Sequence, residues 1–565
     1  MAATNWLAAV TGSVVNEDGQ PCASAVLRFT DTTNGRHFEV TTDRAGHFTH
    51  IAVRPSHYRL EVIRHSQRPA SFPDIDLEWS ARPLLVDIDL GAQTVKISRQ
   101  VQLAETFGSE PPPPTLPSNS TSYDATVGAI NQKIAAAQTA MNSGNWDEAL
   151  AAAKSATEID PNRDLPWAWL ANVNCQEARR VPAQALSSLQ ACIRNYQSAI
   201  AISPQAAYFN NLGTAFASLN EWTAAIDQFR AAQKASSNDV SLYHLNLGVA
   251  LLRQSELTAT STAGAEMQSA VAEFSAAASS VPAMNEAYYW KGLCELRLAA
   301  LETKGFTFQS ARDSFTRYLQ LVPDGPYAYD ARSMIEALTA RAINEKIGAA
   351  KAFLESGDWD NALTAAQAAA EIDPSRDLPW AWVASVYCAK AGSDLAHSPH
   401  ALRSCVLHYQ TAIAISPQAA YFNNLGTAYS SLNDWAAAAD QFRAAQNASP
   451  DYVPLYHLNL GVALLKQSES QSDSGVTTLL RSAAAEFALA ASSVPAINEA
   501  YYWTGLCELR LAALEITGFT FDKAREYFRH YLELVPSGPH SSDSKALLES
   551  IANSRASTSA AISKP

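Results

Sequence analysis

The stretch Ser203-PQAAYFNNLGTA-Phe216 occurs twice in this chain, because Ser416-PQAAYFNNLGTA-Tyr429 repeats it almost unchanged. Two further stretches, Tyr243-HLNLGVALL-Arg253 and Ala287-YYWKGLCELRLAALE-Thr303, also return with few changes at the same offset of 213 residues. A constant offset over three stretches indicates that the two halves come from one duplicated template without net insertion. We therefore expect both halves to have the same architecture.

A shorter period lies inside each half. It is clearest in a set of alternating small and large residues: Phe209, Leu212, Gly213, Phe216, Ala225, Phe229 and Ala232. This spacing resembles that of the tetratricopeptide repeat (TPR), a helical hairpin of about 34 residues. Two antiparallel helices approach closely where small residues lie at the crossing, and aromatic rings fill the space beside them. The resemblance covers roughly residues 126–555 and implies five repeats in each half.

Residues 8–103 follow a different pattern, with short alternating apolar runs separated by turns such as Asp18-Gly19. The order Gly12-x-Val14, Asp18-Gly19-x-Pro21 and Thr42-Asp43-x-x-Gly46-x-Phe48 resembles the carboxypeptidase regulatory-like, or transthyretin-like, domain. That resemblance implies a small β-sandwich of a kind common in secreted and surface bacterial proteins, and one that is not itself catalytic.

The sequence thus predicts a mainly α fold, a superhelix of TPR hairpins in two duplicated arrays of five repeats, preceded by a small β-sandwich. A run of four prolines, Pro111 to Pro114, favours a semi-rigid spacer between the two regions. The expected boundaries are the β-sandwich at 1–107, a Pro/Ser-rich linker at 108–125, the first array at 126–341, the second array at 342–556 and a flexible tail at 557–565.

The composition argues against nucleic-acid binding and against a membrane-spanning helix. Of 565 residues, 17% are charged and 47% are hydrophobic, so the chain is a folded protein with low charge. Lys and Arg number 41 against 55 Asp and Glu, a net charge of −14 without a basic stripe, which argues against binding to nucleic acid. No apolar stretch approaches the roughly 20 residues of a membrane-spanning helix. The first ten residues lack the pattern of a secretory signal, so an exported chain would have lost its signal by processing.

The seven cysteines are too few for a disulfide framework and show no zinc-binding spacing. Cys175 and Cys192 recur as Cys388 and Cys405, and each pair is expected on the two facing helices of one repeat. A disulfide there would need an oxidising compartment, and buried free thiols are the favoured interpretation. Cys294 and its equivalent Cys507 are expected to be core thiols.

Histidines offer no convincing site. Five of the twelve histidines lie in the β-domain without a fixed ligand spacing, so surface positions are favoured over a metal site. His244 and His457 occupy a repeat position usually filled by a bulky packing residue, and core packing is expected for them. No nucleophile elbow, phosphate loop or carboxylate pair is present, so the sequence predicts no enzyme activity, no cofactor and no bound metal.

The TPR resemblance implies that partner peptides lie on the inner face, which the first helix of each repeat lines. In repeats four and five this face is apolar, and the lysines and arginines that clamp acidic peptides in co-chaperones are missing, since repeat three offers Asn210 and Thr214 instead. An alternative is that the apolar residues pack within the stack. The candidate groove residues are Leu245, Val249, Leu252, Tyr289, Leu293 and Leu296, with Leu458, Val462, Leu465, Tyr502, Leu506 and Leu509 as equivalents.

The duplication also suggests self-assembly. Because the end of half one must accept the start of half two, the free end of half two resembles a surface already shaped to receive another copy, and such a contact can give fibres or rings. Against this, Tyr327 and Tyr329 at the internal junction become His540 and Ser542 at the free end, as expected for a polar cap.

The sequence therefore predicts a non-enzymatic, extracellular or cell-surface structural protein that assembles head-to-tail with itself, as a filament or another homo-oligomer, or binds surface partners. The alternative is a monomeric, cytoplasmic TPR scaffold that binds a partner peptide or helix in the apolar concave groove. The identity of the partner and the symmetry of any oligomer are left open by the sequence.

Overall fold

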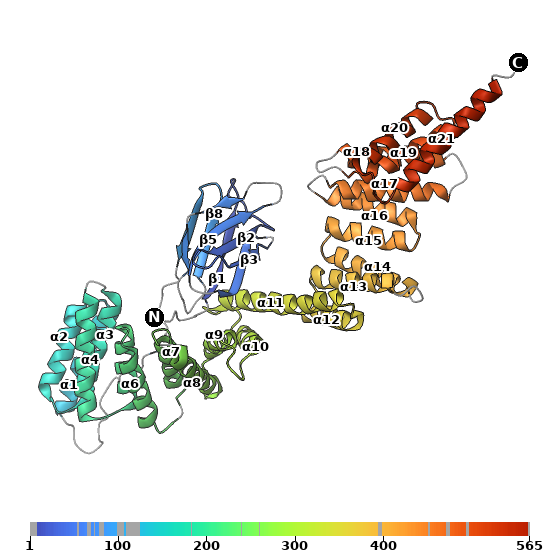
Figure 1. The fold of residues 1–565 in the computed structure, drawn as a ribbon. Coiled ribbons are helices and arrows are strands. Elements are labelled where there is room, and N and C mark those ends of the chain that lie inside the picture. Colours follow the sequence, from blue (N-terminus) through green and yellow to red (C-terminus); the bar gives the residue numbers. More distant parts are fainter. Residues whose placement is uncertain are drawn as a thin grey trace. The chain divides into compact units, whose positions relative to one another are not determined.

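The computed structural model describes residues 8–43, 45–53, 56–64, 69–72, 74–77, 84–98, 107–108, 125–181, 184–238, 240–258, 260–393, 398–449, 453–470, 475–492 and 497–562. It divides into two compact units, residues 1–338 and residues 339–565. The first unit holds the β-sandwich and the first helical array, and the second unit holds the second array (Figure 1).

The β-sandwich is built from two sheets whose inner faces share one apolar core around Phe29, Leu60 and Val86. One sheet has the strand order β4-β1-β8-β9, in which β1 and β8 run parallel, and the other has the order β3-β2-β5-β6, with β7 also paired to β5. The strands are β1 Ala8–Val15, β2 Val26–Asp31, β3 His37–Thr41, β4 His47–Val53, β5 Ser56–Ile63, β6 Ala70–Ser71, β7 Ile75–Leu77, β8 Leu84–Asp89 and β9 Thr94–Ser98.

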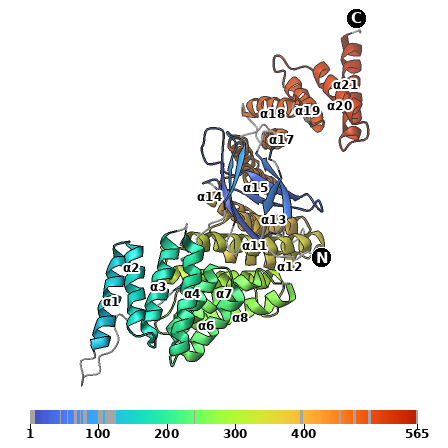
Figure 2. The ribbon, with the colours of Figure 1, turned by 90° about the vertical axis from the view of Figure 1, so that its left-hand side faces the viewer.

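The first array consists of five helical hairpins, as the repeat count predicted, and neighbouring pairs stack side by side in sequence order (Figure 2). Its helices are α1 Ala125–Asn142, α2 Trp146–Ile159, α3 Asp164–Arg180, α4 Ala185–Ile202, α5 Ala206–Ser218, α6 Trp222–Ala235, α7 Ser241–Ser255, α8 Thr260–Ser279, α9 Ala287–Ala300 and α10 Phe308–Leu321.

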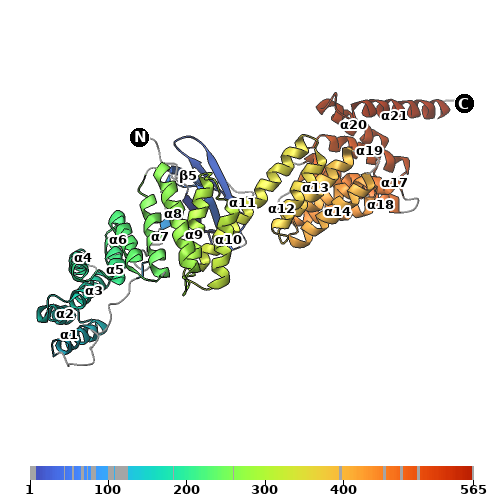
Figure 3. The ribbon, with the colours of Figure 1, turned by 90° about the horizontal axis from the view of Figure 1, so that it is seen from below.

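The second array repeats this arrangement, and a last helix packs against α20 beyond the fifth hairpin (Figure 3). Its helices are α12 Trp359–Ile372, α13 Asp377–Ser393, α14 Ser398–Ile415, α15 Ala419–Ser431, α16 Trp435–Ala448, α17 Pro454–Glu469, α18 Gly475–Ser492, α19 Glu499–Ala513, α20 Phe521–Leu534 and α21 Ser541–Ile562.

One helix, α11 Ala328–Glu355, connects the two units. Its first part covers the last hairpin of the first array, where Ala331 and Met334 are buried, and its second part is the first helix of the second array, where Ile343 and Ile347 are buried. The chain therefore continues as one helix from the end of the first half into the start of the second half.

Close approach of the two helices of a hairpin depends on glycine. A Cβ atom built at Gly213 would lie 2.7 Å from the Phe229 ring, and one built at Gly248 would lie 2.7 Å from the Phe274 ring. The equivalent glycines of the second array face phenylalanine rings in the same way. The small-and-large alternation in the sequence is thus a direct steric fit between facing helices.

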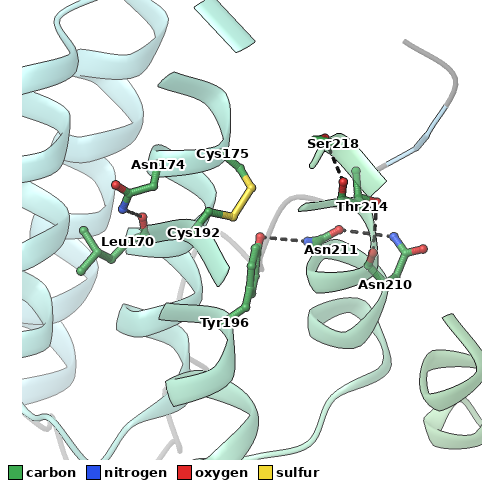
Figure 4. The surroundings of a disulfide bond; sticks show 9 residues. All are labelled: Leu170, Asn174, Cys175, Cys192, Tyr196, Asn210, Asn211, Thr214 and Ser218. Carbon is green, nitrogen blue, oxygen red and sulfur yellow. Dashed lines mark hydrogen bonds between the residues drawn. A yellow bond between two sulfur atoms is a disulfide. The ribbon is translucent and has the colours of Figure 1, made fainter. Parts of the chain in front are cut away.

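The expectation of free thiols at the recurring cysteine pairs is wrong. Cys175 on α3 is disulfide-bonded to Cys192 on α4 (Figure 4). Cys388 on α13 is bonded to Cys405 on α14 in the same way. The facing helices of one hairpin bring the paired Cα atoms to 5.3 Å and 5.4 Å, inside the range that a disulfide requires. Cys294 and Cys507 are buried free thiols, as expected, and burial raises the pKa of each to about 12.

Candidate functional site

Two residues that precede the proline run, Phe107 and Gly108, lie against the first array. The Gly108 amide donates to Asn246 Oδ1 at 3.1 Å, and Asn246 Nδ2 donates back to the Gly108 carbonyl at 2.8 Å. Asn210 Nδ2 donates to the same carbonyl at 3.2 Å. One residue, Gly108, is therefore held through both its backbone donor and its backbone acceptor. We call Asn210 and Asn246 the first clamp.

A chain of side-chain hydrogen bonds fixes the orientation of the clamp amides. Asn246 Nδ2 donates to Asn210 Oδ1 at 2.7 Å, Asn210 Nδ2 to Asn211 Oδ1 at 3.3 Å, and Asn211 Nδ2 to the Tyr196 hydroxyl at 3.0 Å. Figure 4 shows the part of this chain that runs from Tyr196 on α4 to Asn210 on α5. Burial raises the pKa of Tyr196, so its hydroxyl stays neutral. The clamp is thus pre-organised by four helical residues.

Phe107 fills an aromatic slot beside the clamp. Its ring centroid lies 5.9 Å from that of Phe229 and 6.2 Å from that of Trp222, and both pairs are stacked. Phe107 is only 7% exposed and belongs to the main core cluster of the first array. Stacked aromatic pairs add about 0.5–1.5 kcal/mol to the free energy gained by burial. The ring is therefore an anchor for the segment.

Glycine at position 108 suits the close approach of its backbone to α7. A Cβ atom built there would lie 2.3 Å from Leu242 Cδ1, so any larger residue would require the Leu242 side chain to move. The face of α5 carries no charged side chain. The site therefore accepts an aromatic residue followed by glycine, and it holds the glycine through its backbone.

The second array carries the same residues at the same offset. Asn459 Nδ2 donates to Asn423 Oδ1 at 2.8 Å, Asn423 Nδ2 to Asn424 Oδ1 at 3.4 Å, and Asn424 Nδ2 to the Tyr409 hydroxyl at 3.2 Å. Trp435 and Phe442 occupy the positions of the aromatic slot. We call Asn423 and Asn459 the second clamp.

The predicted groove residues are placed differently in the two arrays. All six in the first array are buried, and Leu245 lies in the same cluster as Phe107. In the second array Leu465 and Tyr502 are buried, while Leu458, Val462, Leu506 and Leu509 are half-buried. Packing within the stack thus accounts for the set in the first array, and the second array leaves part of the face accessible.

The four residues expected at the assembly ends fall into two pairs. Tyr327 stacks on Tyr289 with centroids 4.4 Å apart, and His540 stacks on Tyr502 at 4.2 Å, so each ring is engaged within its own array. Tyr329 is 52% exposed and Ser542 is exposed, so these two remain on the surface.

The expectation of core packing for His244 and His457 is wrong. His244 on α7 pairs with Glu273 on α8 at 2.6 Å, and His457 pairs with Glu486 at 2.7 Å, with partly exposed side chains in both pairs. Each glutamate lies on the second helix of the same hairpin, so each histidine lies at a polar, partly exposed contact between the two helices rather than in the core. In the β-domain His37, His47 and His57 are exposed and His50 is half-buried, while His65 lies outside the described residues.

Within the described part of the chain, no group of three or more histidine, cysteine or carboxylate side chains is arranged to hold a metal ion. Among the same residues, no helix is both long and apolar enough to cross a membrane.

The clamp was not predicted from the sequence, although Asn210 and Thr214 were recognised at positions where co-chaperone repeats carry lysine or arginine. The available signal was the pair Asn210 and Asn246, polar residues on an otherwise apolar face, which recurs as Asn423 and Asn459. Thr214 supports the clamp by donating to the Asn210 carbonyl at 3.0 Å, and its hydroxyl lies 3.4 Å from the Gly108 carbonyl.

Comparison with known proteins agrees with this architecture. A family model for the carboxypeptidase regulatory-like domain matches residues 9–91, and one for the tetratricopeptide repeat matches residues 176–240 and 211–259. No curated protein matches the chain.

Among solved structures, the TPR protein YrrB, described as having an unusual peptide-binding site, is 18% identical, with a TM-score of 0.28 over 37% of this chain and 97% of its own. MamA is 17% identical, with a TM-score of 0.28 over 35% of this chain and 93% of its own. Yeast Tom70 is 11% identical, with a TM-score of 0.27 over 76% of this chain and 96% of its own. The chain thus joins a carboxypeptidase regulatory-like domain to an array of tetratricopeptide repeats, the architecture of a protein-protein interaction scaffold.

Proposed function

We propose that this chain is a non-enzymatic interaction scaffold that binds extended protein segments on the first helices of its TPR hairpins. The observation that carries the proposal is the docking of Phe107 on α6 and of Gly108 on α5 and α7. The clamp contacts backbone atoms and the aromatic slot contacts one side chain, so affinity comes from the main chain and specificity from the aromatic-glycine pair.

The strength of these contacts favours an exchangeable ligand. The three hydrogen bonds made by the clamp contribute about 1 kcal/mol each, and the burial of one phenylalanine contributes about 2 kcal/mol. A total of about 5 kcal/mol sets a lower limit of about 0.2 mM on the dissociation constant of a free peptide, because association also costs translational and rotational freedom. Tethering at an effective concentration in the millimolar range keeps the segment bound most of the time, and a competing segment can displace it.

Release of the tethered segment should make the first clamp available. The probe is a fluorescently labelled peptide of residues 103–112, Leu-Ala-Glu-Thr-Phe-Gly-Ser-Glu-Pro-Pro, measured by equilibrium dialysis against the full chain. Phe107→Ala should bind more peptide than the native protein, whether or not the native protein binds any, because it removes the tethered competitor. Adding Asn210→Ala and Asn246→Ala should return the ratio to the native value. Equal binding by all three proteins would contradict a peptide site at the first clamp.

Export is part of the proposal. The Cys175–Cys192 and Cys388–Cys405 disulfides support it, because disulfides form and persist in oxidising compartments outside the cytosol. The β-sandwich supports it as well, since the module it resembles is common in secreted and surface proteins. In this proposal the chain presents the β-domain and its helical arrays at or beyond the cell surface.

Self-assembly is a second candidate, favoured by the fact that the bound segment belongs to the chain itself. A segment that docks on its own array can also dock on the same array of a second copy, and such exchange gives closed dimers or rings or an open filament. Light scattering coupled to size-exclusion chromatography should then show a mass that rises with concentration for the native protein and stays monomeric for Phe107→Ala. A native protein that is monomeric at every concentration would exclude this route.

A further inference from the structure

We infer that the second clamp, Asn423 and Asn459, is a binding site for an aromatic-glycine segment supplied by a different protein. The inference rests on the proposed function of the first clamp and extends it to the second array.

The two clamps share one hydrogen-bond chain. Each step from the tyrosine hydroxyl to the outer asparagine is present in both arrays, including the donation from Asn459 to Asn423 at 2.8 Å and from Asn246 to Asn210 at 2.7 Å. The amide oxygen of Asn459 therefore has the same orientation as that of Asn246, which accepts the Gly108 amide. The second clamp is pre-organised for a backbone donor and acceptor of one residue, as the first clamp is for Gly108.

The two sites differ in exposure. Asn210 and Asn246 are fully buried and Thr214 is 3% exposed, with Gly108 lying against all three. In the second array Asn423 is 9% exposed, Asn459 is half-buried and Thr427 is exposed. In the aromatic slot Trp222 is buried and Trp435 is half-buried, whereas Phe229 and Phe442 are both buried, so only the tryptophan side of the second slot is more exposed. A segment can therefore reach the second clamp from solvent.

The sequence shows why the ligand comes from another protein. Phe107-Gly108 is the one place in the 565 residues where an aromatic residue precedes glycine, so each chain has two clamps and a single matching segment. That segment is already bound at the first clamp, and the same holds for a second copy of the chain. A free segment on a different molecule meets no such competition.

The chemistry of this ligand follows from the site. Helix α15 carries no charged side chain, as is also true of α5, so the clamp itself gives no preference for an acidic or basic residue. The ligand is an extended, exposed stretch in which phenylalanine or another aromatic residue precedes glycine. Leu455, which takes the place of Leu242, is 46% exposed and lies where the glycine would pass.

The test uses the native full-length chain, whose first clamp is occupied, and the labelled peptide of residues 103–112 in equilibrium dialysis. The native protein should bind the peptide, and Asn423→Ala with Asn459→Ala should lower the ratio of bound to free peptide at least fivefold, the remainder being exchange at the first clamp. Asn459→Asp, which replaces the amide donor with a carboxylate, should cause a similar loss while conserving shape. Asn447→Ala, at an exposed position on α16, and a peptide with serine in place of phenylalanine are the matched controls.

Two results would overturn the inference: native protein that does not bind the peptide, or binding that the variants of Asn423 and Asn459 leave unchanged. An oligomer of the native protein that these variants convert to a monomer would assign the site to a second copy and would overturn the heterologous source. The proposed function fails separately, since it depends on the binding that Phe107→Ala adds at the first clamp.

Discussion

Phe274→Ala is expected to lower the free energy of unfolding of the first array by about 3–5 kcal/mol. The ring is fully buried between α7 and α8, and it fills the space over Gly248. Its removal leaves a cavity that the neighbouring helices cannot close without losing their own contacts. Urea unfolding monitored by circular dichroism gives the change, and amide hydrogen exchange of α7 and α8 assigns it to this hairpin.

A pair of glycines provides the matched control. Gly248→Ala should lower the free energy of unfolding by about 1–3 kcal/mol, because the added Cβ would overlap the Phe274 ring. Gly264→Ala on α8 should raise it by about 0.5–1 kcal/mol, since no atom lies within 4 Å of the added Cβ and alanine favours the helix. Effects of the same sign and size at both positions would contradict the steric fit proposed for these hairpins.

Loss of the Cys175–Cys192 disulfide is the second large effect. The bond closes a loop with a sequence separation of 17, and a loop of that length is expected to contribute about 3 kcal/mol through the entropy of the unfolded chain. Cys175→Ser with Cys192→Ser should therefore lower the free energy of unfolding of the first array by about that amount. A reductant should destabilise the native protein and have a smaller effect on the double variant, which keeps only the second disulfide.

An identical response of the native protein and this variant to the reductant would show that Cys175 and Cys192 are not bonded. The equivalent pair Cys388 and Cys405 provides an internal comparison, because it should give a similar change in the second array.

The repeat architecture could be predicted from the sequence because it depends on local spacing. Gly213 and Phe229, for example, are neighbours in one hairpin, and their small-and-large pattern recurs at a fixed distance. The continuity of α11 was also predictable, since no proline or glycine interrupts the segment from Ala328 to Ala340. Such features follow from residues close together in the chain.

The clamp could not be predicted in the same way. Gly108 and Asn246 are 138 positions apart, and their contact depends on the direction of amide groups that hydrogen bonds to Asn211 and Tyr196 fix. The disulfides were missed for a related reason, since spacing alone does not distinguish two adjacent thiols from a bonded pair. His244 was expected in the core because its repeat position usually holds a bulky packing residue. Its ion pair with Glu273, 29 residues further along the chain, could not be recognised from the sequence.

The most direct test of the central claim, that Phe107 and Gly108 dock on the first clamp, is the hydrogen exchange rate of the Gly108 amide. Mass spectrometry with fragmentation of the region around residue 108 can measure this rate. We predict a slowly exchanging amide in the native protein, because it donates to Asn246, and exchange at the rate of an unstructured peptide in the Asn210→Ala, Asn246→Ala variant. The same fast rate in both proteins would contradict the account.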